Sequence, residues 1–87
     1  MSYRIKFSSQ AEKDYEFIKK STLAKKAKLI LKILQKNPYS PPCEKLKNNL
    51  KGAYSKRLNI QHRIVYEVRE ENKTVVILRM WTHYEKL

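Results

Sequence analysis

The last third of the chain most constrains the fold, because three extended segments follow one another there with short connections. Residues 53–60, 62–69 and 74–81 alternate apolar and polar side chains or are rich in β-branched residues. A parallel crossover needs about a dozen or more residues, so segments joined this closely pair antiparallel. We therefore predict an antiparallel meander whose second turn is Glu70-Glu71-Asn72-Lys73.

The N-terminal half predicts a strand followed by two helices. Tyr3, Ile5 and Phe7 alternate with polar residues, which is typical of a strand with one buried face. Ser9 and Glu12 fit a capping box that opens a helix ending near Lys20. A second helix ends at Asn37-Pro38 and has an apolar stripe of Leu23, Ala27, Ile30, Leu31 and Leu34. The short break at Ser21-Thr22 predicts an antiparallel helix hairpin. The expected fold is α+β: one domain, residues 1–87, with a mainly antiparallel sheet and the helix pair on one face.

The alternation along the strands predicts which side chains face away from the helices. If Ile64, Tyr66 and Val68 face the helices, Arg63 lies on the opposite, open face. Inward-facing Leu58 and Ile60 place Arg57 on that face together with Ser55. In the third strand we expect Val76, Leu78 and Met80 in the core, which leaves Arg79, Trp81 and His83 on the open face. Val75 and Ile77 are apolar too, so this strand is alternatively buried on both faces or set in the other register.

The charge of the chain indicates a polyanionic or acidic partner. Twenty Lys and Arg against eight Asp and Glu give a net charge of +12, whose self-repulsion costs stability. Nucleic acid, an anionic membrane surface and an acidic protein are the candidates. No apolar run reaches the roughly 20 residues that span a bilayer, and the apolar stripe of the second helix is needed for the core. One Cys and two His provide neither a disulfide nor four zinc ligands, so we expect a cytoplasmic protein without a metal or other cofactor.

Glu44 is the only acid between Glu16 and Glu67, an interval that holds thirteen Lys or Arg residues. RNA carries its own nucleophile, the 2′-hydroxyl, so cleavage needs a base, a phosphate clamp and an acid, without a metal. Glu44, Arg63 and His83 can fill these roles, with Glu44 either taking the proton or positioning another group that does. Alternatively, Glu44 is a solvated acid paired with a neighbouring lysine, and His83 is an inert residue near the chain end.

Several motifs together resemble the YoeB/Txe branch of the RelE-type bacterial toxins. They are Glu44-Lys45-Leu46-Lys47, Gly52, Tyr54-Ser55-Lys56-Arg57, His62-Arg63-Ile64-Val65-Tyr66 and His83-Tyr84. The resemblance implies a fold similar to microbial ribonucleases and a ribosome-dependent endonuclease that cuts messenger RNA in the A site of the 70S ribosome. It implies that Glu44 is the general base, His83 the general acid and Arg63 the transition-state clamp. It also implies phosphate contacts by Lys47 and Arg57, a substrate-orienting role for Tyr84, and an antitoxin partner. Given the charge, we expect that antitoxin to be acidic and partly disordered.

The chain departs from this family pattern at a few positions. Lys56 stands where many relatives have Arg, Lys45 replaces a common Pro, and Thr82 replaces a frequent Tyr. Glu85-Lys86-Leu87 extend beyond Tyr84, where the family usually ends. None of these departures removes a candidate catalytic group. The competing hypothesis is a basic module that binds RNA or DNA without catalysis.

Overall fold

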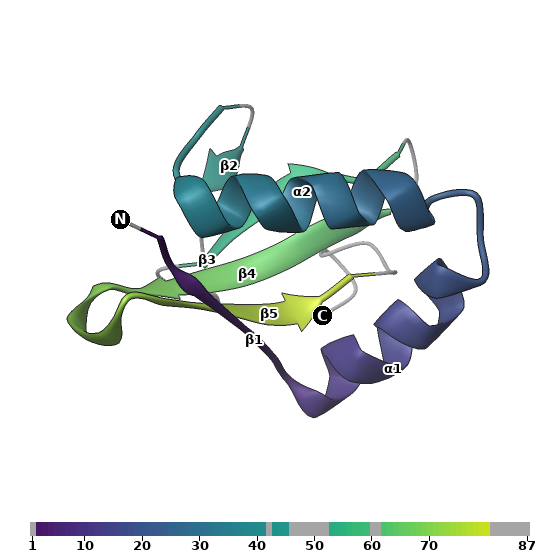
Figure 1. The fold of residues 1–87 in the computed structure, drawn as a ribbon, viewed down its shortest axis with the longest axis horizontal. Coiled ribbons are helices and arrows are strands. Elements are labelled where there is room, and N and C mark those ends of the chain that lie inside the picture. The colour runs from purple at the N-terminus through teal and green to yellow at the C-terminus, as the bar shows by residue number, and fades with distance from the viewer. Residues whose placement is uncertain (1, 42, 46–52, 60–61, 81–87) are drawn as a thin grey trace.

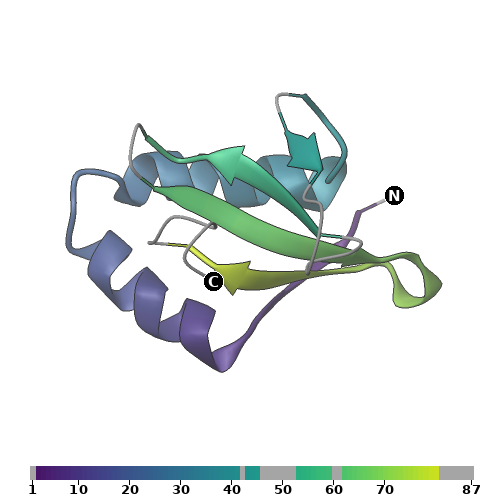
Figure 2. The same ribbon diagram turned by 180° about the vertical axis from the view of Figure 1, so that it is seen from behind.

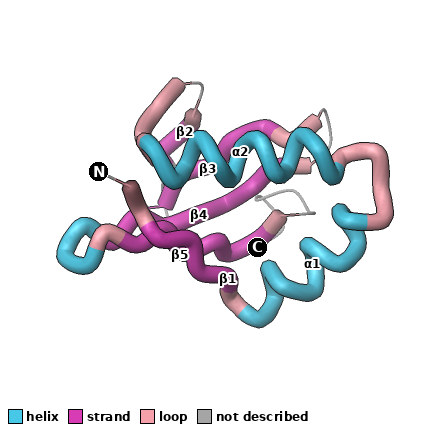
Figure 3. Tube along the Cα trace, in the orientation of Figure 1, coloured by secondary structure: helices cyan, strands magenta, loops and turns pink. Residues whose placement is uncertain are grey.

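The computed structural model describes residues 2–41, 43–45, 53–59 and 62–80, and this part of the chain forms an α+β fold (Figure 1). In chain order the elements are β1 (Arg4–Phe7), α1 (Ser9–Lys19), α2 (Ala24–Lys36), β2 (Glu44–Lys45), β3 (Ala53–Arg57), β4 (Arg63–Arg69), a short 3-10 turn (Glu70–Asn72) and β5 (Thr74–Arg79). The helices α1 and α2 follow the first strand, and the remaining strands come after them in the chain. Figure 3 distinguishes the helices from the strands by colour.

The five strands form one mixed sheet in the order β1-β5-β4-β3-β2. The pairs β3–β4 and β4–β5 are antiparallel, which confirms the predicted meander. Its second turn lies where expected, and Lys73 closes it with a left-handed backbone, φ 52°. β1 pairs parallel with β5, because the helices carry the chain across one face of the sheet between them. The short strand β2 brings Glu44 into the sheet at the edge opposite β1.

Both helices cover the same face of the sheet, as predicted, and the opposite face is turned to the viewer in Figure 2. The core between the layers joins side chains of both helices to those of the central strands. Its fully buried members include Ala11, Ile18, Ala27, Leu34, Leu58, Ile64, Tyr66, Val75, Ile77 and Met80. Among the described ranges there is no helix with the length and apolarity that crossing a membrane requires.

The first helix begins one residue earlier than the sequence suggested. Ser8, not Ser9, is the N-cap, and its Oγ accepts a hydrogen bond from the Ala11 amide at 3.1 Å. Ser8 also donates through Oγ to the Leu78 carbonyl at 3.0 Å and through its amide to the Ile77 carbonyl at 2.9 Å. These bonds to β5 select Ser8 over an equally suitable neighbour, because either serine can satisfy the free amides of the first turn.

The first alternation expected along β5 is wrong, and the other register, given as the alternative, is the one observed for Val75 and Ile77. Val75 and Ile77 enter the main core, whereas Leu78 packs with Ala53 and Val65 in a second, smaller cluster on the open face. Only Met80 of the three predicted core residues joins the main cluster. The β4–β5 ladder shifts register between Val65 and Tyr66, whose partners are Arg79 and Ile77, so Leu78 is an extra residue. Such a bulge resets the alternation of the residues that follow it.

Candidate functional site

Arg57 and Arg63 lie directly opposite each other on the open face, at one end of the β3–β4 ladder. The turn that joins these strands is closed by Leu58 and Asn59, whose amides both donate to the His62 carbonyl at 2.9 and 3.1 Å. The His62 amide in turn donates to Asn59 Oδ1 at 2.6 Å. The turn therefore holds the two arginines at opposed positions of the ladder, and both lie on the open face, as the strand alternation predicted. His62 takes part in the turn through its backbone.

Glu44 reaches the same face from β2. Its cross-strand partner is Ser55, so its side chain projects on the side of the sheet that carries Arg57 and Arg63. Arg63 Nη1 donates to Glu44 Oε1 at 3.2 Å. The carboxylate side chain is 60% exposed and the guanidinium side chain 17%. An ion pair this open to water contributes about 0–1 kcal/mol to folding. The contact therefore defines the geometry of the site and contributes little to the stability of the fold.

Ser55 lies beside Glu44 and was anticipated on this face only as a neighbour of Arg57. It is 1% exposed, and its Oγ has no hydrogen-bond partner within the described ranges. A buried hydroxyl without a partner carries a desolvation penalty of roughly 1–3 kcal/mol. The floor of the site is otherwise apolar at this point, because Ala53 and Val65 flank Ser55 on the same face.

Arg79 does not join the two arginines of the site, contrary to the expected alternation. Its Nε donates to Asp14 Oδ2 of α1 at 2.9 Å, and the Met80 amide donates to the same oxygen at 3.1 Å. Asp14 is 4% exposed. No local pattern predicts this pair, because an acid at this helical position is typical of a solvated side chain. The pair fixes the end of β5, from which the chain leads toward His83.

Three of the six candidate site residues lie outside the described residues: Lys47, His83 and Tyr84. Trp81, which was expected on the open face, lies outside them too. Glu44, Arg57 and Arg63 are described, and the structure brings all three to one face of the sheet. In the described part of the chain, no three side chains of the His, Cys, Asp or Glu type gather closely enough to hold a metal ion. Cys43 is a free thiol.

Comparison with known proteins agrees with this architecture. The family model for the YoeB-like toxin of bacterial type II toxin–antitoxin systems matches residues 7–84. A toxin YoeB from Synechocystis is 29% identical over 87 residues, covering 95% of this chain and 99% of the relative.

Solved structures give the same result. The YoeB toxin of Staphylococcus aureus is 35% identical, over 97% of this chain and 100% of the other. It has been solved as a dimer, with a TM-score of 0.81, and in a YoeB–YefM complex, with a TM-score of 0.79. A YoeB/ParE toxin from Agrobacterium tumefaciens is 22% identical over 93% of this chain and 99% of the other, with a TM-score of 0.86, and so supports the fold. The chain therefore belongs to the YoeB-like toxins of bacterial type II toxin–antitoxin systems.

Proposed function

We propose that this toxin is a ribosome-dependent endoribonuclease that cleaves translated messenger RNA in the A site and so arrests translation. The observation that carries the proposal is the contact between Glu44 and Arg63, beside a second arginine, on the open face of the sheet. A carboxylate held against a guanidinium within a strongly basic protein suits an RNA phosphodiester. The carboxylate can accept a proton while the arginines neutralise the charge of the phosphate.

The reaction uses the 2′-hydroxyl of the RNA as the nucleophile. Glu44 takes the proton of this hydroxyl, or positions the group that takes it, while the 2′-oxygen attacks the adjacent phosphorus. Arg63 stabilises the charge of the phosphorane, because its planar fork matches two phosphate oxygens and remains protonated. His83 protonates the departing 5′-oxygen. The products are a 2′,3′-cyclic phosphate and a free 5′-hydroxyl, so the chemistry is balanced without a metal.

The remaining candidate residues bind and orient the substrate. Arg57, opposite Arg63, and Lys47 contact the phosphates, and Tyr84 orients the base or ribose at the cleavage site. Without RNA, the Arg63 guanidinium is engaged by Glu44 at 3.2 Å. The scissile phosphate competes for that guanidinium, and the exchange frees the carboxylate for the 2′-hydroxyl. Arg63 thus exchanges its contact with Glu44 for one with the phosphate when RNA binds.

The proposed partners are messenger RNA, the 70S ribosome and a cognate antitoxin. The net charge of +12 favours association with ribosomal RNA. We expect the toxin to act in the cytoplasm, where ribosomes work. The S. aureus toxin forms a complex with YefM. We propose an analogous partner here, acidic and partly disordered, that binds the basic surface of the toxin.

The test is to map the 5′ ends of cellular messages after brief induction of the toxin. Cuts inside coding frames, at a fixed distance from stalled ribosomes, are expected for the parent and are absent for folded Glu44→Ala and His83→Ala variants. When the toxin acts on intact ribosomes, with magnesium retained for the ribosome, chelators of transition metals are expected to leave the rate of cleavage unchanged. If both variants cleave as well as the parent, the site assignment is wrong. Intact RNA combined with salt-dependent ribosome binding would instead identify a non-catalytic binding module.

A further inference from the structure

The segment that leads from α2 into β2 is anchored at several points, and it ends at Glu44. Pro38 is fully buried, and its carbonyl accepts a hydrogen bond from the Tyr66 hydroxyl of β4 at 2.6 Å. The Ser40 carbonyl accepts one from Lys56 Nζ of β3 at 2.7 Å. Lys56 is 5% exposed, so this bond is shielded from water. Side chains of β4 and β3 therefore anchor two successive parts of the segment, at Pro38 and at Ser40.

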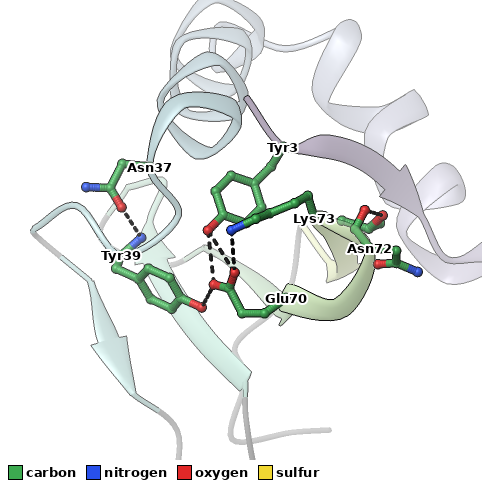
Figure 4. A network of polar contacts seen from close by, with 7 residues as sticks. Tyr3, Asn37, Tyr39, Glu70, Asn72 and Lys73 are labelled. Carbon is green, nitrogen blue, oxygen red and sulfur yellow. Dashed lines mark hydrogen bonds and ion pairs between the residues drawn. The ribbon is translucent and has the colours of Figure 1, made fainter. Parts of the chain in front are cut away.

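A third anchor comes from the β4–β5 turn (Figure 4). The Glu70 carboxylate accepts hydrogen bonds from the Tyr39 hydroxyl, from the Tyr3 hydroxyl at 3.0 Å and from Lys73 Nζ at 3.0 Å. Lys73 Nζ also lies 5.2 Å from the centroid of the Tyr3 ring, within the range of a cation–π contact. One carboxylate thus gathers three donors from three parts of the chain, of which only Tyr39 belongs to the segment before Glu44.

The aromatic side chains join these anchors into one unit. The Tyr39 ring meets the Tyr54 ring edge to face, with centroids 5.5 Å apart, and Tyr54 stacks on Tyr66 at 5.9 Å. Partial desolvation, and then the hydrogen bond to Glu70, raise the pKa of Tyr39, which favours the protonated hydroxyl that donates to Glu70. Asn37 Oδ1 accepts from the Tyr39 amide at 3.0 Å and stiffens the start of the segment.

We propose that Tyr39 and Glu70 are positioning residues that hold Glu44 against Arg63, acting through the anchored residues 37–41 that precede β2. This inference rests on the proposed function and deepens it, because it assigns a role in catalysis to a turn remote from the reacting groups. Glu44 is mostly exposed and its ion pair is weak. The ion pair alone therefore does not hold the carboxylate in place, and the anchors supply the missing rigidity. Misplacing a catalytic group by about 1 Å costs on the order of 10²-fold in rate.

The experiment compares Tyr39→Phe, Glu70→Gln and the double variant in the full-length toxin. Glu71→Gln is the matched control, because it removes a carboxylate from the same turn and Glu71 has no described hydrogen bond or ion pair. Amide exchange of Glu44 and Lys45 is followed by NMR, together with exchange in α2. Cleavage on ribosomes is followed through kcat and KM. The first readout needs no catalysis, so the anchors can be judged even if the toxin cuts no RNA.

Each single variant is expected to speed exchange at Glu44 and Lys45 about tenfold, with exchange in α2 unchanged. Each is expected to lower kcat about 10- to 100-fold with KM within about twofold. Because Tyr39 and Glu70 act on the segment through their contact with each other, the double variant should lose no more than the more affected single variant. Unchanged exchange at Glu44, faster exchange throughout the protein, additive losses, or an intact kcat beside faster local exchange would each overturn the proposal. Failure of the parent to cleave RNA, with the exchange result as expected, would refute only the proposed function.

Discussion

Arg57 and Arg63 occupy directly opposed positions in the β3–β4 ladder, which sets two positive charges against each other on the open face. Like charges at opposed positions destabilise a sheet. Among the described ion pairs, these two arginines share only one, which joins Arg63 to the carboxylate of Glu44. A pair of this kind is retained at a cost to folding, which is reasonable where an anionic substrate binds.

Arg57→Gln is therefore expected to stabilise the toxin while weakening its function. Removing the repulsion should raise the free energy of unfolding by about 0.5 kcal/mol, or the melting temperature by about 2–4 °C. The slope of ribosome affinity against salt should fall by about one phosphate contact. Arg4→Gln is the control, because Arg4 is opposed by Thr74 rather than by a second guanidinium. Equal stabilisation in both variants would show that net charge, not the opposed pair, is responsible.

Asp14→Ala tests the ion pair that fixes the end of β5. Asp14 Oδ2 accepts both from Arg79 Nε and from the Met80 amide, and the carboxylate is almost fully buried. The substitution leaves the Arg79 and Met80 donors without this acceptor. We therefore expect the free energy of unfolding, measured by urea unfolding, to fall by about 2–3 kcal/mol. Glu16→Ala is the control, because it breaks an exposed pair with Lys19 in the same helix. Its urea midpoint should match that of the parent, and an equal loss in both variants would argue against a special role for Asp14.

The strands that carry the site were predictable because their two faces differ. Along β4 the core-facing residues Ile64, Tyr66 and Val68 lie at every second position, and this period correctly placed Arg63 on the open face, although Val65 on that face is apolar too. Along β5 the pattern does not distinguish the two faces of the strand, because the open face carries an apolar residue as well: Leu78, which packs in the second cluster. The alternation of β5 then depends on the bulge where its pairing with Val65 and Tyr66 of β4 shifts register. A bulge is defined by the pairing of two strands, so the sequence of neither strand alone predicts it.

Tertiary contacts decide the features that sequence reasoning missed. Two adjacent serines can each cap α1, and the choice of Ser8 depends on its bonds to β5. β2 is too short to display a period, although it delivers Glu44. The buried pair of Asp14 with Arg79 joins residues 65 positions apart, and no local pattern encodes it. Recognition of the family motifs, by contrast, required only the residues themselves.

The Glu70 anchor makes the stability of the toxin depend on pH in a defined direction. The hydrogen bond from Tyr39 contributes most to lowering the pKa of Glu70, followed by those from Lys73 and Tyr3. A carboxyl whose pKa is lower in the folded than in the unfolded state stabilises the fold above the unfolded pKa, near 4.3. This contribution is lost as the pH falls through the folded pKa. The difference in urea midpoint between the parent and Glu70→Gln should therefore shrink from pH 6 to about pH 3, whereas Glu71→Gln should follow the parent throughout. A constant difference would mean that the ionised form of Glu70 is not the one that the anchor uses.

Arg63→Lys separates the shape of the clamp from its charge. Lysine keeps the positive charge, so the exposed contact with Glu44 and the overall stability should change little. A lysine ammonium cannot match two phosphate oxygens with a planar fork, so the charge that develops in the transition state loses a directed donor. The loss of one such donor typically lowers kcat about 10²- to 10³-fold, and we expect a fall of this size in single-turnover cleavage on ribosomes. Arg69→Lys makes the same exchange further along β4, where the arginine pairs with Glu67, and should leave the rate unchanged. If Arg63→Lys cleaves at the parental rate, Arg63 acts only as a positive charge, and the directed clamp must be sought in another side chain.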